Sequence, residues 1–118
     1  MKLALALIVA IAITPQQDEK IYAAHDEGVT LPQVVTQVGP QYTSEAMRQM
    51  IEGEVVLDVV VKSDGTVGDV KVTQSLDAVY GLDESAVRAM KQWKFKPGTK
   101  AGKAVNVRVE VRMRFTLK

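Results

Sequence analysis

The chain lacks cysteine, has a single histidine and carries little aromatic mass, with 5% Phe, Trp and Tyr among its 118 residues. The absence of cysteine excludes disulfide bonds, thiolate catalysis and zinc sites built on sulfur ligands. His25 stands beside acidic residues, and a lone histidine there is typical of a solvated side chain rather than a metal site. No phosphate-binding loop, nucleophile elbow or metal-ligand spacing occurs, and no carboxylate pair is marked out. We therefore expect a protein that is not an enzyme and that needs no cofactor.

Long apolar runs are also missing. The run Leu3–Ile13 would span about 16 Å as a helix, well short of the ~30 Å hydrocarbon core of a bilayer. A lysine, this run and the small-residue pattern Ala10-Ile11-Ala12 are typical of a secretory signal, with a buried strand or helix as the alternative. We predict a signal peptide over residues 1–14, a flexible polar segment over 15–28 and one folded domain over 29–118.

Acidic residues are scarce in the last quarter of the chain. Residues 91–118 hold nine Lys or Arg and one acid, whereas residues 1–90 hold six bases and thirteen acids. Such a split indicates either a basic surface for an anionic polymer or two halves that neutralise each other within one sheet. A nucleic-acid surface is disfavoured because few aromatic side chains remain for base stacking.

Two β-branched runs surround Asp64-Gly65, which is a strong hairpin signal. If the turn has two residues, paired residue numbers sum to 129. Val59 then faces Val70, Leu57 faces Val72 and Asp58 faces Lys71, so that apolar pairs share one face and the charged pair lies on the other.

Helices are expected on both sides of this hairpin. The first is predicted to start at Thr43 or Ser44 and to end by Gly53. The second is predicted to have Asp83 as its N-cap and to run into Trp93, before Pro97 ends it. Its apolar stripe consists of Leu82, Ala86, Met90 and Trp93. We expect Trp93 and Phe95 to close one end of the helix–sheet core.

The final segment alternates apolar and polar residues from Val105 to Leu117, which predicts a long strand with one wet face. Residues 29–38 predict an edge strand or extended arm because Pro32 interrupts them. The fold class is therefore α+β, with two layers: a three-stranded antiparallel sheet and two helices on one face. A right-handed crossover would place the last strand beside the first, with its arginines near Glu54 and Asp58.

Residues 39–118 resemble the C-terminal domain of the TonB family of energy transducers. The matching motifs are Pro40-x-Tyr42 with Ala46, Gly53-x-Val55, Asp64-Gly65, Leu82-Asp83-x-x-Ala86, Trp93-x-Phe95-x-Pro97, Gly102-x-x-Val105 and Phe115. The resemblance implies structural roles for Gly53, Asp64, Gly65, Leu82, Asp83, Trp93, Phe95 and Pro97. Two features depart from the family: Thr43 follows Tyr42 where the family has proline, and four prolines cannot form its proline-rich spacer.

The resemblance implies a periplasmic module that binds a peptide of an outer-membrane transporter as an added strand. Its partner-binding residues would be the edge-strand set Val107, Arg108, Val109, Glu110, Val111, Arg112, Met113 and Arg114, with Pro40, Gln41 and Tyr42 near the first helix. A separate inner-membrane motor complex is a further implied partner, and the chain would be membrane-associated if more sequence precedes Met1. The residues themselves leave open a homodimer through the same edge and a soluble anionic-polymer binder.

Overall fold

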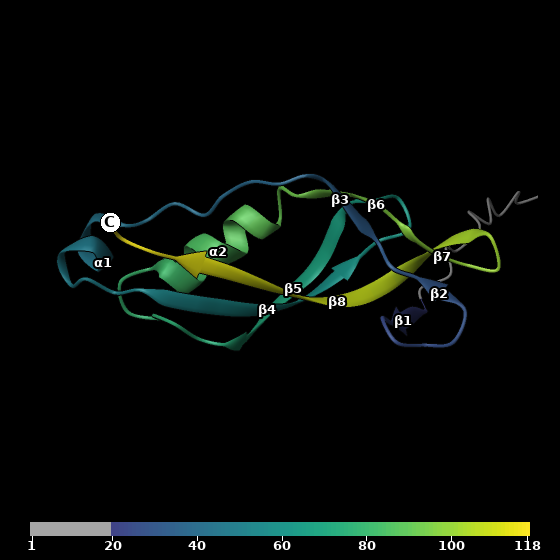
Figure 1. Ribbon diagram of the computed structural model, residues 1–118, viewed down its shortest axis with the longest axis horizontal. Helices are drawn as coiled ribbons and strands as arrows, with labels where there is room; N and C mark the ends of the chain where they lie inside the picture. The colour runs from purple at the N-terminus through teal and green to yellow at the C-terminus, as the bar shows by residue number, and fades with distance from the viewer. Residues whose placement is uncertain (1–19) are drawn as a thin grey trace, which may run out of the picture.

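A computed structural model describes residues 20–118, so the predicted signal peptide and residues 15–19 lie outside the described part (Figure 1). Three long strands form the body of the fold. Strand β4 (Gly53–Val61) lies in the middle and pairs antiparallel with β5 (Val67–Gln74) on one side and β8 (Lys103–Phe115) on the other. The last strand therefore lies beside the first long strand, as the crossover argument predicts.

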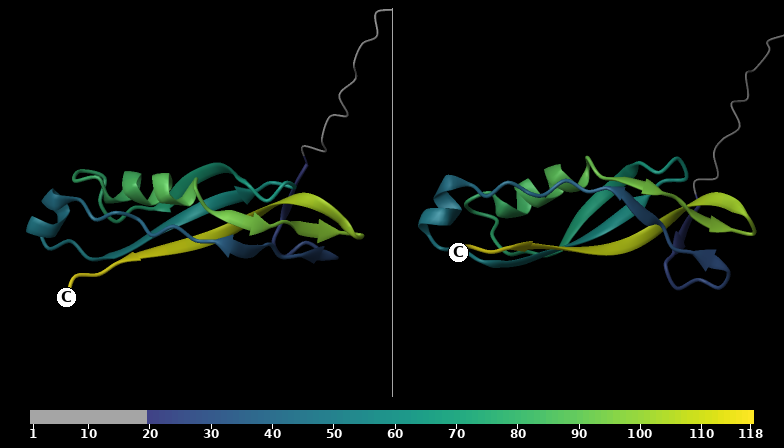
Figure 2. Two further views of the ribbon diagram at one scale, coloured as in Figure 1. Left: turned by 90° about the horizontal axis from the view of Figure 1, so that it is seen from above. Right: turned by 45° about the horizontal axis from the view of Figure 1, so that its top comes forward.

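Helix α2 (Leu82–Met90) covers one face of this sheet, which confirms the predicted two-layer α+β class (Figure 2). Leu82, Ala86 and Met90 are fully buried against the sheet, as the apolar stripe predicts. Facing them in β4 are Val55, Leu57, Val59 and Val61, all fully buried. The helix ends three residues before Trp93, which is a correction to the longer helix expected from the sequence. Trp93 is nevertheless buried at the end of the same stripe, and a separate strand, β6 (Lys94–Lys96), precedes Pro97.

The start of α2 also differs from the prediction, because Asp83 is not its N-cap. Gly81 caps the helix without a side-chain hydrogen bond, and the Leu82 N–H donates to the Asp77 carboxylate at 3.2 Å. Asp83 points backwards instead and accepts the N–H groups of Leu76 and Asp77 at 2.9 and 3.0 Å. The two aspartates thus satisfy the backbone of the 75–82 loop reciprocally, which a single capping rule does not anticipate.

Replacing Asp83 by asparagine is expected to make the fold less stable at neutral pH by about 1–3 kcal/mol, because a charged acceptor is lost. Burial raises the pKa of Asp83, but donors from Asp77, Ser75 and Leu76 outweigh it and hold the pKa below its usual value. A depressed folded-state pKa contributes stability above the unfolded pKa of about 3.9, and this stability is lost as pH falls through the folded value. Urea titrations from pH 7 to pH 2 should therefore show the two proteins converging in acid. A gap that stays constant with pH would contradict this prediction.

The β4–β5 register confirms the predicted pairs Leu57–Val72, Asp58–Lys71 and Val59–Val70. The two-residue turn is wrong, however. Lys62 donates its N–H to the Thr66 carbonyl, and the Gly65 N–H returns to the Lys62 carbonyl, so the loop has three residues. Gly65 has a φ of 86°, as a three-residue loop with a bulge requires, and a register shift between Val59 and Val61 compensates for the longer loop. A side chain at Gly65 would collide with the Phe95 carbonyl oxygen, because β6 packs directly on this loop.

Helix α1 (Ser44–Arg48) is short and lies at the end of the sheet, beside the C-terminus (Figure 1). Thr43 caps it as predicted, accepting the Ala46 N–H at 3.2 Å. Gly53 does not end it. Met50 takes the left-handed conformation with a φ of 56°, and the Ile51 N–H closes the last turn on the Ala46 carbonyl. Ala46 is the buried residue of this helix, whereas Met47 and Met50 are exposed.

Short strands gather at the opposite end of the molecule. Strand β7 (Gly98–Lys100) forms a hairpin with the start of β8, and β2 (Val29–Thr30) adds to β7. Strand β3 (Gln33–Thr36) pairs with β6, so residues on both sides of Pro32 are extended as predicted. Strand β1 (Ile21–Ala23) runs parallel to β8 at residues 106–108. Residues 20–28 are therefore part of the folded structure rather than a flexible segment.

Candidate partner-binding edge

The outer edge of β8 divides into a covered half and an open half. Strand β7 pairs with residues 103–105 and β1 pairs with residues 106–108. From Val109 to Phe115, β8 pairs with β4 on one side, and no described strand lies on the other. Of the predicted edge-strand residues, Val107 and Arg108 therefore lie beside β1, while the six from Val109 to Arg114 lie on the open half. Unpaired backbone groups of this kind can accept an additional strand.

The two faces of this open edge differ in chemistry. On the helix side, Val109 and Val111 are half-buried, and Met113 and Phe115 are buried. On the other side, Glu110, Arg112 and Arg114 are exposed and alternate with the apolar residues. A strand added here would meet apolar side chains on one face and charged ones on the other.

The exposed arginines of β8 are already paired with acids on the same sheet face. Arg108 lies 3.0 Å from Asp58, and Arg114 lies 3.3 Å from Glu54. Arg112 contacts both Glu54, at 3.5 Å, and Glu110, at 3.0 Å. These pairs confirm the expectation that the basic last strand lies against acids of β4. Because all six side chains are at least partly exposed, each pair contributes little stability and remains available for exchange.

Tyr42 joins the segment before α1 to the end of this edge. Its ring packs edge-on against Phe115, with centroids 5.4 Å apart, and its hydroxyl donates to the Ile51 carbonyl. Burial, and then the charge of Glu52, raises the pKa of Tyr42, so the phenol stays protonated as a donor. Pro40 is half-buried and the Gln41 side chain is exposed. The structure thus brings one of the three predicted residues, Tyr42, into contact with the predicted edge strand.

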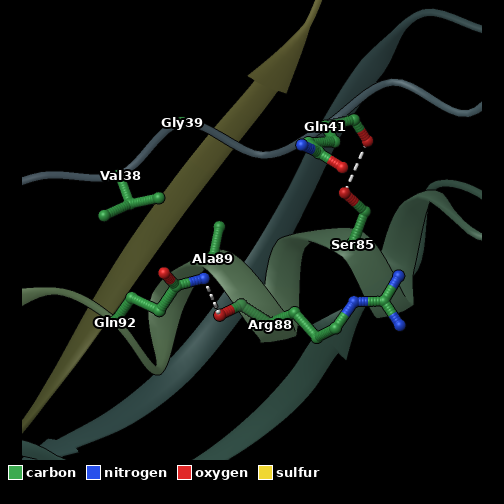
Figure 3. A pocket seen from close by; sticks show the side chains of 7 residues that line it. All are labelled: Val38, Gly39, Gln41, Ser85, Arg88, Ala89 and Gln92. Atoms are coloured by element: carbon green, nitrogen blue, oxygen red, sulfur yellow. Dashed lines mark hydrogen bonds between the residues drawn. The ribbon is translucent and has the colours of Figure 1, made fainter.

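A polar groove of about 360 Å³ lies between residues 38–41 and α2. Figure 3 shows the Ser85 hydroxyl donating to the Gln41 backbone oxygen and the Gln92 amide donating to the Arg88 carbonyl. Arg88 points outward along the helix and pairs with Glu84 at 2.7 Å. The Ser85–Gln41 hydrogen bond fastens residues 38–41 to the helix, so the groove is explained by the packing of this segment.

Trp93 and Phe95 are structural, as the sequence indicates. The Trp93 indole N–H donates to the Val38 carbonyl at 2.8 Å, and its ring lies 6.0 Å from that of Phe95. Phe95 pairs with Val34 of β3 and donates its N–H to the Gly65 carbonyl at 2.8 Å. The two rings therefore hold together the end of α2, the β4–β5 loop and the segment leading to α1.

Sequence reasoning missed β1 and the division of the edge that it causes. The residues concerned, Ile21, Tyr22 and Ala23, lie between polar residues and give too short an apolar pattern to predict a strand. The outer edge of β5 also remains open in the described structure, since β5 pairs with β4 alone. Two edges of the sheet are thus available, as expected for a three-stranded core. No helix among residues 20–118 is long and apolar enough to cross a membrane.

Comparisons with known proteins identify relatives of this fold. The family described as Gram-negative bacterial TonB protein C-terminal matches residues 38–117. The protein TonB of Vibrio cholerae is 31% identical over 115 residues, which cover 88% of this chain and 46% of that protein. The protein tonB2 of Pseudomonas aeruginosa is 37% identical over 78 residues, which cover 66% of this chain and 28% of that protein. The chain thus spans less than half the length of these curated relatives.

A solved structure agrees with the topology. The solution NMR structure of the Pseudomonas aeruginosa TonB CTD matches with a TM-score of 0.56 and 23% identity, covering 81% of this chain and 95% of that chain. At this identity the likeness shows the fold. The family match extends from Val38, at the segment fastened by Trp93, to Leu117, just beyond the open edge. By that match, the chain belongs to the family of Gram-negative bacterial TonB proteins, of which it carries the C-terminal domain.

Proposed function

We propose that this chain is a periplasmic TonB-type interaction module that binds an extended peptide of an outer-membrane transporter through residues Val109–Arg114. The observation that supports this most directly is the second edge of β8, which no described strand covers from residue 109 to residue 115. An incoming strand there would extend the order β5-β4-β8 by one member. Family membership supports the partner class, a transporter of the outer membrane.

The edge favours a peptide with two unlike faces. Val109 and Val111 would contact small or apolar side chains on the helix side. On the opposite face, Arg112 and Arg114 would attract acidic side chains of the peptide. These side chains would compete with Glu54 and Glu110 for the two arginines. Since these pairs are exposed, salt should weaken the attraction. The backbone ladder supplies affinity, and the alternating side chains supply selectivity.

The role in transport is that of a connector rather than of an enzyme. A domain that only accepts a strand from a transporter can transmit force to it only if another protein or segment links the domain to an energy source. A separate inner-membrane motor complex is the partner that would supply this link. The homodimer remains the second candidate, since the same open edge can pair with that of another copy.

Disulfide trapping tests which edge receives the peptide, because the wild-type chain has no cysteine to interfere. Arg112→Cys and Arg114→Cys place a thiol on the wet face of the open β8 edge. Lys71→Cys and Thr73→Cys place one at matched exposed positions on the β5 edge. Candidate transporter peptides would carry one cysteine, moved a residue at a time, and products would be separated by non-reducing electrophoresis.

We expect cross-links at Arg112→Cys and Arg114→Cys that alternate with the peptide position, as the two-residue period of a strand requires. Trapping at β5 alone would overturn the proposal. Cross-links between two copies of the chain, which block peptide capture, would identify the homodimer as the state that uses this edge.

A further inference from the structure

Strand β1 lies on the same edge of β8 that stays open further along the strand. Val107 and Arg108 pair with β4 on one side and with β1 on the other. From Val109 onward the β4 pairing continues, while no described strand takes the place of β1. Because β1 runs parallel to β8, its last residue, Ala23, is directed toward Val109. The C-terminal end of β1 therefore marks the point where the open half of the edge begins.

The chain turns sharply as soon as β1 ends. The Asp26 N–H donates to the Ala23 carbonyl at 3.0 Å, and the Asp26 carboxylate accepts the Ala23 N–H at 2.8 Å. The Val29 N–H then donates to the Asp26 carbonyl at 3.2 Å. These bonds hold residues 23–29 in a closed turn that satisfies both backbone groups of Ala23. The turn thus lies at the end of β1 that faces the open half of the edge.

Contacts on both sides of this turn anchor it to the β7–β8 hairpin. Beyond the turn, β2 pairs with β7, where Val29 faces Lys100. The Lys100 ammonium donates to the Glu27 carbonyl at 3.2 Å and lies 5.2 Å from the centroid of the Tyr22 ring. Residues 21–30 are therefore attached to β8 through β1 and to β7 through β2. An incoming strand that displaced β1 would also loosen these contacts.

We propose that β1 is a stop that limits the paired segment of a bound peptide to the seven residues opposite Val109–Phe115. The inference rests on the proposed function, since it requires a peptide that adds at this edge. A strand that displaced β1 would exchange one set of backbone hydrogen bonds for an equal set, and the contacts of the turn would be lost. Pairing beyond Val109 is therefore unfavourable, and the peptide has to leave the sheet there.

The stop specifies the kind of peptide that the edge accepts. Seven residues in a strand span about 23 Å, so the ligand is a short extended segment of the partner. At the end that meets β1, the partner chain needs no strand-forming residues, because it no longer pairs with the sheet. Turn-forming residues such as glycine, proline and asparagine suit that position, since the partner chain must bend away from Ala23.

A pair of proline variants in β1 tests the stop in the full chain. Backbone N–H groups of consecutive strand residues point to opposite sides, and the Ala23 N–H is used within the turn, so that of Tyr22 is directed to β8. Tyr22→Pro therefore removes the donor that holds β1 in place. Ile21→Pro removes an N–H that points away from β8 and serves as the matched control. No residue of β1 belongs to the buried core, so both variants should stay folded, which a melting curve checks.

Titration calorimetry would compare these proteins with peptides of different length. The probe is the seven-residue transporter segment that cysteine trapping places opposite Val109–Phe115, alone or extended at either end by three alternating Thr and Val residues. With the wild type and Ile21→Pro, extension at the end that meets β1 should leave the affinity unchanged within twofold. With Tyr22→Pro the same extension should raise the affinity about fivefold, the effect of roughly one net backbone hydrogen bond.

A second pair of variants tests the turn itself and keeps the experiment decisive if Tyr22→Pro unfolds. Asp26→Ala removes the acceptor of the Ala23 N–H and should give a gain in the same direction. Glu27→Ala removes the same charge one residue later and should behave as the wild type does. Equal gains from extension in the wild type and the variants, or no gain at either end in any protein, would overturn the inference. A seven-residue peptide that binds none of the proteins would instead overturn the proposed function, and the inference with it.

Discussion

Replacing Trp93 by alanine is expected to lower the free energy of unfolding by about 3–5 kcal/mol, most of the stability of a domain of this size. Trp93 is 7% exposed, its ring lies beside Phe95 and its indole N–H donates to the Val38 carbonyl. Its removal would leave a cavity at the end of α2 and an unsatisfied backbone oxygen in the segment that leads to α1. Urea unfolding followed by circular dichroism gives the measurement.

Trp93→Phe separates the two contributions. Phenylalanine keeps much of the apolar volume but loses the indole donor, so it should cost less than the alanine variant. Val79→Ala serves as the surface control, because Val79 is 81% exposed and its truncation should change stability by less than about 0.5 kcal/mol. A Trp93→Ala midpoint close to that of the Val79→Ala control would contradict the structural role of the indole.

The central fold could be predicted because its signals are local and repeated. Strand β8 alternates apolar and polar residues from Val105 to Phe115, and the apolar stripe of α2, Leu82, Ala86 and Met90, is fully buried. If the apolar residues of β8 or of α2 were displaced by one position, the element would turn polar side chains toward the core. The strand order then followed from the handedness of a crossover connection, which needs no side-chain detail.

The boundaries could not be predicted because they depend on contacts between distant segments. The three-residue loop at Gly65 packs on β6. The Phe95 N–H donates to the Gly65 carbonyl, and the Phe95 carbonyl oxygen leaves no room for a side chain at Gly65. Asp83 looks like a cap in sequence, but Asp77 satisfies the helix start instead. Strand β1 is three residues long and is stabilised by pairing with β8 rather than by its own pattern.

The candidate site shows the same division between local and long-range information. Alternation in β8 predicted which side chains share a face, and the arginine pairs with Glu54 and Asp58 followed from the strand order. Which half of β8 stays open depends on β1, so Val107 and Arg108 could not be separated from Val109–Arg114 by sequence. The sequence shows a basic C-terminal quarter, but only the structure shows that the arginines of β8 pair with Glu54, Asp58 and Glu110.

A pair of proline variants at adjacent positions of β8, Val111→Pro and Arg112→Pro, is expected to separate folding from peptide binding. Consecutive residues of a strand direct their N–H groups to opposite edges, so one of the two donates to β4 and the other to the open side. Proline at the first kind of position removes a hydrogen bond of the central ladder and should unfold the domain. Proline at the second kind removes only an unpaired donor, as edge strands tolerate.

The folded member of the pair should bind a transporter peptide at least tenfold more weakly, because the added strand loses a backbone donor and meets the proline ring. Titration calorimetry gives the affinity, and a melting curve identifies which variant is folded. Val70→Pro and Lys71→Pro make the matched pair on β5, where the register with β4 is regular, and its folded member should bind as the wild type does. Wild-type affinity in the folded β8 variant would mean that the peptide does not extend the sheet at Val109–Arg114, however open that edge is. Loss of binding there, with the β5 control intact, would make backbone pairing the source of recognition.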